Sequence, residues 1–95
     1  MDRAFDGARR LRLTGEYDLA DKAHLTELFG GIPPNGPAAI DMTAVTYIDT
    51  TFLHEVDALR LRLNGHRVTL VGLNKNLQRL LHIVNFDHLF EIVAA

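Results

Sequence analysis

Hydrophobic residues in this chain alternate between two spacings, and this alternation restricts the fold more than any other feature. Residues 11–15 follow the every-second-residue spacing of a half-buried strand. Short apolar runs at 38–42, 45–48 and 67–71 also predict strands, with a bend at 43–44, and the apolar residues before position 93 predict a last one. Segments with helical spacing separate them. This order predicts an α/β domain, with helices packed on a mixed, mostly parallel sheet of four to five strands.

Three helices are predicted between the strands. Their apolar faces consist of Leu19, Ala23, Leu28 and Phe29; of Phe52, Val56, Leu59 and Leu63; and of Leu77, Leu80, Leu81 and Val84. Asp18 or Asp21 precedes the first helix and Asn74 the third, and such short polar side chains cap a helix start. Gly30-Gly31 and Asn64-Gly65 are typical of the residues that end a helix.

Composition excludes several classes of function. At 95 residues and 10.6 kDa the chain is predicted to be one domain, 1–95, with its core at about 10–93. The chain has ten basic and twelve acidic residues, and this near balance argues against electrostatic binding to nucleic acid or to a membrane. The chain has no cysteine and no serine, so thiolate and serine-hydrolase chemistry are excluded. Without a signal-peptide pattern or a long apolar run, we expect a cytoplasmic protein that does not insert into a membrane.

The triplet Asp49-Thr50-Thr51 is the most informative candidate site. It stands where a predicted strand ends and a helix begins, which is where ligands and partners usually meet an open α/β sheet. The N–H groups and dipole at a helix start favour negative charge, so a hydroxyl there can carry a phosphate without breaking the helix. On the triplet alone, plain helix capping is the simpler interpretation.

Three segments together resemble the STAS domain family, which includes bacterial anti-sigma factor antagonists and transporter-associated modules. They are residues 11–18 (LRLTGEYD), 40–51 (IDMTAVTYIDTT) and 68–74 (VTLVGLN), in the family's order. The resemblance implies an adaptor that binds an anti-sigma factor, which is also a protein kinase, and that is released by phosphorylation and restored by a phosphatase. It implies Thr51 as the phosphorylated residue, supported by Asp49 and Thr50, with Asp18 close to the partner.

The sequence departs from the family pattern directly after the threonines. Family members usually have Gly-Leu-Gly there, whereas this chain has Phe52-Leu53-His54. Phe52 is predicted either to extend the core or to stand at the interface, so Phe52 and His54 are candidate partner contacts. The chain also ends at Ala95, soon after the last strand, where many relatives continue into another helix. An apolar groove is therefore expected, covered by a partner or by a second copy of the chain.

Two other classes of function are alternatives to the phosphorylation switch. One is a STAS subunit of a bacterial ABC lipid-trafficking transporter, in which the domain contacts the ATPase subunit and the threonine acts by hydrogen bonding. The other is an enzyme, which the absence of any nucleophile–base pair makes the weakest. The five histidines form no pair at metal-ligand spacing, so neither a metal nor another cofactor is expected. Asp41, after a buried strand, is predicted to cap the following bend.

Overall fold

The computed structural model describes residues 9–94 of the chain. In chain order the elements are β1 (Arg9–Tyr17), the short 3-10 helix η2 (Leu19–Asp21), α1 (Lys22–Gly30), β2 (Ala38–Ile48), α2 (Thr50–Arg62), β3 (Val68–Leu73), α3 (Lys75–Ile83) and β4 (Glu91–Ala94). The four strands form one sheet in the order β1-β2-β3-β4, and every neighbouring pair is parallel. The predicted α/β fold with a mostly parallel sheet is therefore confirmed.

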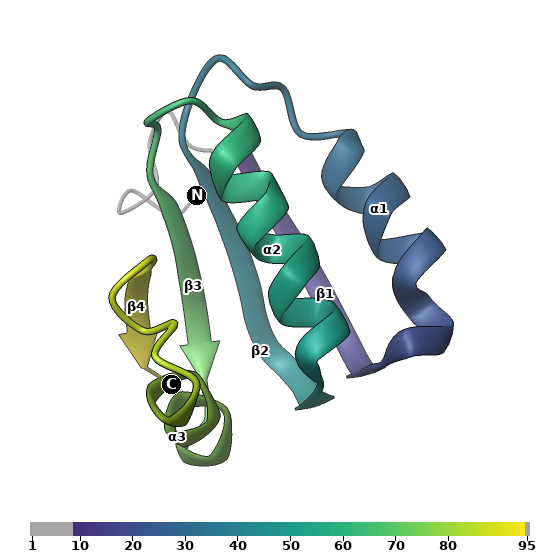
Figure 1. Ribbon diagram of the computed structural model, residues 1–95, viewed down its shortest axis with the longest axis vertical. Coiled ribbons are helices and arrows are strands. Elements are labelled where there is room, and N and C mark those ends of the chain that lie inside the picture. Colours follow the sequence, from purple (N-terminus) through teal and green to yellow (C-terminus); the bar gives the residue numbers. More distant parts are fainter. Residues whose placement is uncertain (1–8, 95) are drawn as a thin grey trace.

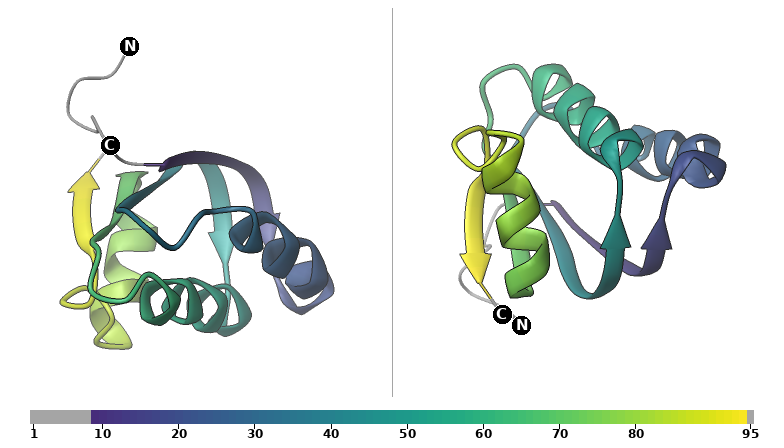
Figure 2. Two further views of the ribbon diagram at one scale, coloured as in Figure 1. Left: turned by 90° about the horizontal axis from the view of Figure 1, so that it is seen from above. Right: turned by 60° about the horizontal axis from the view of Figure 1, so that its bottom comes forward.

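The two faces of the sheet differ in polarity, as the residues paired across the strands show. One row across all four strands is apolar and consists of Leu11, Ile40, Leu70 and Ile92. The next row is Arg10, Ala39, Thr69 and Glu91, and its side chains point to the opposite face because side chains alternate along a strand. Helices α1 and α2 lie side by side on one face of the sheet (Figures 1 and 2). The apolar row belongs to the core between that face and the helices.

The core confirms two of the three predicted helical faces and corrects the first. Phe52, Val56, Leu59 and Leu63 of the second face are buried, as are Leu77 and Leu81 of the third. In the first helix Leu19 is 72% exposed, and Leu25, which was not predicted, is buried together with Phe29. The chain makes a 3-10 turn before α1 begins at Lys22. This turn shifts the phase of the helix, so Leu19 falls off its buried face.

The predicted bend at 43–44 lies inside one continuous strand, β2. The partner of Arg12 is Asp41 but the partner of Thr14 is Ala44, so β2 holds one extra residue at this point. Asp41 Oδ1 accepts a hydrogen bond from the Thr43 N–H (3.0 Å), as predicted for a residue that caps a local bend. The disturbance is thus a bulge, which bends a strand without ending it.

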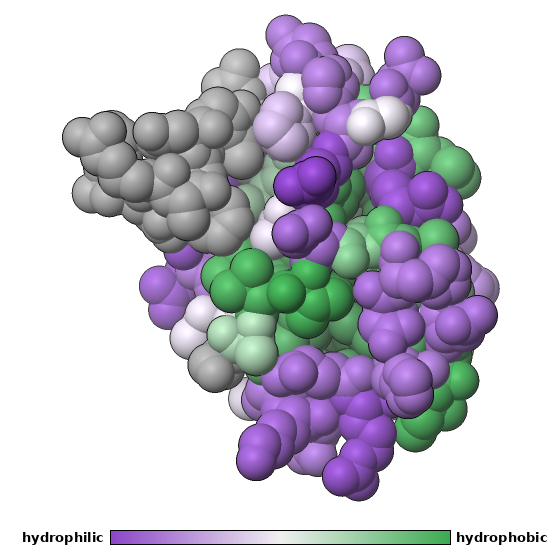
Figure 3. Space-filling view, turned by 90° about the vertical axis from the view of Figure 1, so that its left-hand side faces the viewer, coloured by the Kyte–Doolittle hydropathy of each residue, from purple (hydrophilic) through white to green (hydrophobic). Residues whose placement is uncertain are grey.

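Apolar side chains are exposed at the β4 edge of the sheet. Strand β4 pairs with β3 alone among the described strands. Viewed from the β4 side, apolar surface gathers between hydrophilic rims (Figure 3). Val93 of β4 is 42% exposed, and Ile83 of the neighbouring α3 is 70% exposed. Among the described residues no helix is long and apolar enough to cross a membrane.

Candidate functional site

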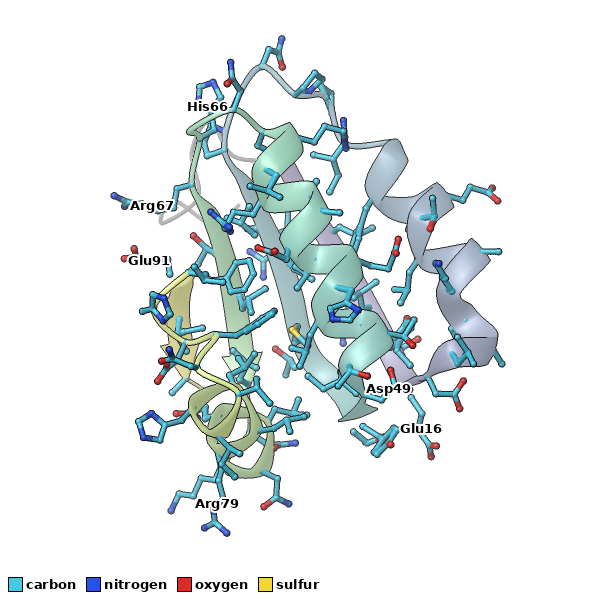
Figure 4. The ribbon with its side chains drawn as sticks, in the orientation of Figure 1. Glu16, Asp49, His66, Arg67, Arg79 and Glu91 are labelled. Atoms are coloured by element: carbon cyan, nitrogen blue, oxygen red, sulfur yellow. The ribbon has the colours of Figure 1, made fainter. Side chains whose placement is uncertain are left out.

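Two acidic residues follow the carboxyl ends of neighbouring strands. Tyr17 at the end of β1 pairs in register with Ile48 at the end of β2. Asp18 and Asp49 follow them directly, so the parallel pairing brings both carboxylates to the same edge. Figure 4 shows Asp49 at this end of the sheet, close to the end of β1. This juxtaposition follows from strand register and would not be expected from the separation of the two residues along the chain.

Asp49 caps helix α2. Its backbone is extended (φ −125°, ψ −170°), and its Oδ1 accepts hydrogen bonds from the N–H groups of Thr51 (2.9 Å) and Phe52 (3.4 Å). The Leu53 N–H donates to the Asp49 carbonyl (3.3 Å), which is the first bond of the helix. The capping role is therefore confirmed. The amides that the sequence offered to a phosphate are already bonded to a carboxylate, so a phosphate here would stand beside an anion.

The two threonines occupy the first turn of α2 and reach solvent. Thr50 is exposed and Thr51 is half-buried. Within residues 9–94, neither hydroxyl makes a hydrogen bond to another residue. A hydroxyl at this position can donate to or accept from a docked partner, or react with a phosphoryl donor.

Phe52 lies in the core, so its side chain cannot contact a partner as predicted. Its side chain has no exposed surface, and its ring packs against the rings of Tyr17 (6.0 Å between centroids) and Phe29 (6.2 Å). Of the two orientations left open by the sequence, the structure has the inward one. The aromatic ring fills space among three elements that would be empty with glycine, and burying a ring of this size favours that orientation.

The other candidate contacts remain on the surface. His54 is exposed on α2, one turn after Thr51. Asp18 is exposed and caps η2, with its Oδ1 accepting from the Ala20 N–H (2.9 Å). Asp21 returns the interaction, because its Oδ2 accepts from the Asp18 N–H (3.0 Å). This reciprocal capping holds the Asp18 loop in one conformation beside the start of α2.

Sequence reasoning missed an aromatic residue at the same edge. Tyr47 pairs in register with Glu16, immediately before Tyr17 and Ile48, and it is 49% exposed. Exposed tyrosines are enriched where proteins bind proteins. The signal was available in the strand pattern, since Ile48 must point inward and its neighbour Tyr47 therefore outward.

Two polar contacts hold α1 against α2 and so position the Asp18 loop. The Thr26 hydroxyl of α1 donates to Glu55 Oε1 of α2 (2.6 Å). At the other end of the helices, the Arg62 guanidinium donates to the carbonyls of Phe29 (2.5 Å) and Ile32 (3.0 Å). Phe29 lies in the last turn of α1, and its carbonyl also accepts from the Ile32 N–H (3.1 Å), whereas Ile32 lies just after the helix. Arg62 thereby links the end of α1 and the segment after it to α2.

The environment of Asp41 strongly favours its charged form. Hydrogen bonds from the Thr43 hydroxyl (2.7 Å) and the Thr43 N–H lower the pKa of Asp41 to about 2, with a smaller contribution from Arg10 (3.2 Å). These interactions outweigh the opposing effect of burial. Asp41 lies on the sheet face opposite the helices, and its hydrogen bonds with Thr43 stabilise the bulge in β2.

An open pocket of about 480 Å³ lies between α3 and β4, with Leu81 and Ile92 in its lining. It has polar residues at its rim, including His82, whose Nδ1 lies 2.8 Å from Asp87 Oδ2. The sequence predicted an apolar groove in this part of the molecule. What covers it stays a prediction. In the described part of the chain, no three His, Asp or Glu side chains are grouped so that they could hold a metal ion.

Comparisons with known proteins identify the fold. A family model described as the MlaB STAS domain matches residues 1–93. The chain is also similar to a solved structure of the anti-sigma factor antagonist SpoIIAA in its unphosphorylated form, with a TM-score of 0.65 over 90% of this chain and 78% of that one. The identity is 14%, so this likeness concerns the fold. No curated protein matches the sequence significantly.

Proposed function

The chain belongs to the STAS domain family, and from this premise we propose that it is a non-enzymatic adaptor that binds a partner protein through the amino end of α2. The observation that carries the proposal is the exposure of side chains at this end of the sheet. Thr51 is half-buried, and its hydroxyl makes no hydrogen bond to any other residue within 9–94. Thr50 and Asp18, at the same end of the sheet, are exposed. Tyr47 adds an exposed aromatic surface on the same edge.

Phosphorylation of Thr51 is the proposed switch. A phosphate adds about −1.5 to −2 charge. It would stand next to the Asp49 carboxylate, which already occupies the amides of the first turn. The added charge therefore gains little from the helix end and acts mainly on the docked partner, through repulsion and through the bulk of the phosphate. The proposed partner is an anti-sigma factor with kinase activity, and a phosphatase reverses the modification.

The switch is tested by incubating the protein with its cognate kinase and ATP and mapping the modified residue by mass spectrometry. We expect phosphate on Thr51 and none on Thr50. The Thr50→Ala variant is the matched control and should be modified at the same rate as the wild type. Phosphate at another residue, or an equal rate with Thr51→Ala, would refute the switch.

A second candidate is a subunit of a bacterial ABC lipid-trafficking transporter that contacts the ATPase subunit. This candidate is supported by the matching family model, which is described by the name MlaB and not as an antagonist of an anti-sigma factor. In this case the Thr51 hydroxyl acts as a hydrogen-bond donor or acceptor and is not modified. Affinity capture from the native cell with wild type and Thr51→Ala separates the two. The switch predicts equal or greater capture of a kinase by Thr51→Ala, and the transporter subunit predicts reduced capture of an ATPase.

A further inference from the structure

Strand β1 forms one border of the sheet and is long for an edge strand. It has nine residues, and among the described strands it pairs with β2 alone (Figure 2). A typical strand has about five or six residues. An edge of this length presents a row of backbone N–H and C=O groups to which another chain can pair. The Thr14 N–H donates to the Tyr17 hydroxyl (3.2 Å), so the groups available for pairing lie on either side of it.

The middle of β1 is open to solvent. Gly15 is exposed, and a Cβ added there would meet no atom within 4 Å. Burial alternates on both sides of this glycine, because Leu13 and Tyr17 are buried whereas Thr14 and Glu16 are exposed. Successive side chains of a strand point to opposite faces of the sheet. The polar side chains of β1 therefore share the face opposite the helices.

Charge divides these polar side chains along the strand. The first half of β1 has the basic residues Arg10 and Arg12, and the second half has Glu16, with Asp18 shortly after it. All four are exposed, and the backbone is still extended at Asp18 (φ −135°, ψ −167°). Within residues 9–94, the side chains of Arg12 and Glu16 make no hydrogen bond or ion pair. Both charges can therefore interact with a second chain.

Antiparallel pairing of β1 with a second copy of itself matches these charges. In a two-fold arrangement centred on Thr14, Arg12 of each copy lies opposite Glu16 of the other, and two-fold symmetry makes this pair occur twice. Residues directly opposite in an antiparallel pair lie on the same face, close enough for their side chains to interact. The flanking residues, Arg10 and Asp18, also have opposite charges. Parallel pairing in register would instead place each charge beside its like, which is unfavourable.

We propose that two copies of the chain associate through their β1 strands in this antiparallel register and form one continuous sheet. The occupant is a second copy, because the charges of β1 complement those of the same strand when its direction is reversed. Charged side chains on an edge strand usually prevent pairing with another edge, whereas here they select one orientation. The proposal does not depend on the proposed function, since it uses neither Thr50 nor Thr51.

The test is charge reversal followed by sedimentation equilibrium at low ionic strength. We expect the wild type to form dimers. Arg12→Glu and Glu16→Arg should each raise the dissociation constant of the dimer at least about fivefold, because two attractive pairs become repulsive. An equimolar mixture of the two variants should associate like the wild type, since each copy then supplies the charges that the other lacks. This rescue is specific to the antiparallel register.

Arg79→Glu on α3 and Glu27→Arg on α1 are the matched controls. Both positions are exposed and lie outside β1, so these variants should dimerise like the wild type. Circular dichroism of each variant confirms that it is folded. The proposal would be overturned by a wild type that stays monomeric at about 1 mM, or by β1 variants that dimerise as well as the wild type. A mixture that associates no better than either variant alone, or assemblies larger than dimers, would also overturn it.

Discussion

Gly72 offers the sharpest test of how the strands are packed, because no side chain fits there. It lies in β3 with φ +78°, a left-handed conformation that favours glycine. A Cβ at this position would overlap with the Thr43 hydroxyl oxygen and come within 3.1 Å of the Thr43 Cα. That hydroxyl donates to Asp41 (2.7 Å), so Thr43 cannot move without disturbing a partly buried hydrogen bond.

The Gly72→Ala substitution should lower the free energy of unfolding by about 2–4 kcal/mol. The left-handed backbone costs an alanine about 1–2 kcal/mol. Overpacking against Thr43 adds about 1–3 kcal/mol. The loss of chain entropy in the unfolded alanine variant returns roughly 0.4–1 kcal/mol. In a domain of this size the net change corresponds to a fall in Tm of roughly 10–30 °C.

Urea denaturation followed by circular dichroism measures this difference, with Gly65→Ala as the matched control. Gly65 has a similar positive φ of 92°, but a Cβ there would meet no atom within 4 Å. The control should therefore lose only about 1 kcal/mol, from backbone strain alone. Adding Thr43→Ala to Gly72→Ala should recover part of the loss, because the obstructing hydroxyl is gone. Equal losses for the two glycine variants would refute the packing argument.

Three further predictions concern single side chains. Replacing Asp49 with alanine should cost about 1 kcal/mol in urea denaturation, because two amides of α2 lose their acceptor. Arg62→Gln should cost about 1–2 kcal/mol, since it removes charged donors from two carbonyls at the end of α1, and unchanged stability would contradict that role. The pKa of Asp41 is lowered from 3.8 to about 2 by folding, so its contribution is complete above about pH 4 and is lost as the pH falls towards 2. Stability measured across this range should fall by about 1–2 kcal/mol more in the wild type than in Asp41→Asn.

Local chemistry made the start of α2 predictable from the sequence. An aspartate followed by two threonines and an apolar stripe is enough to place a helix start, and Asp49 caps it as expected. The first helix was harder, because a three-residue 3-10 turn shifts its phase and moves Leu25 into the core. The inward orientation of Phe52 depends on Tyr17 and Phe29, which come from distant parts of the chain.

The remaining features depend on strand register, which a single sequence determines poorly. The placement of Asp18 and Asp49 at the same end of the sheet depends on the pairing of β1 with β2 after the bulge. Patterns along the chain predict elements, whereas shared edges and pockets arise from how those elements are packed.

The proposed function requires that a partner binds the amino end of α2 beside Thr51. The most direct measurement is the dissociation constant of the captured partner for Thr51→Glu and for Leu61→Glu, which adds the same charge to an exposed position near the other end of the helix. We predict that Thr51→Glu weakens binding at least about tenfold, which corresponds to about 1.4 kcal/mol, whereas Leu61→Glu binds like the wild type. Equal affinities for wild type and Thr51→Glu, with both proteins folded, would contradict it.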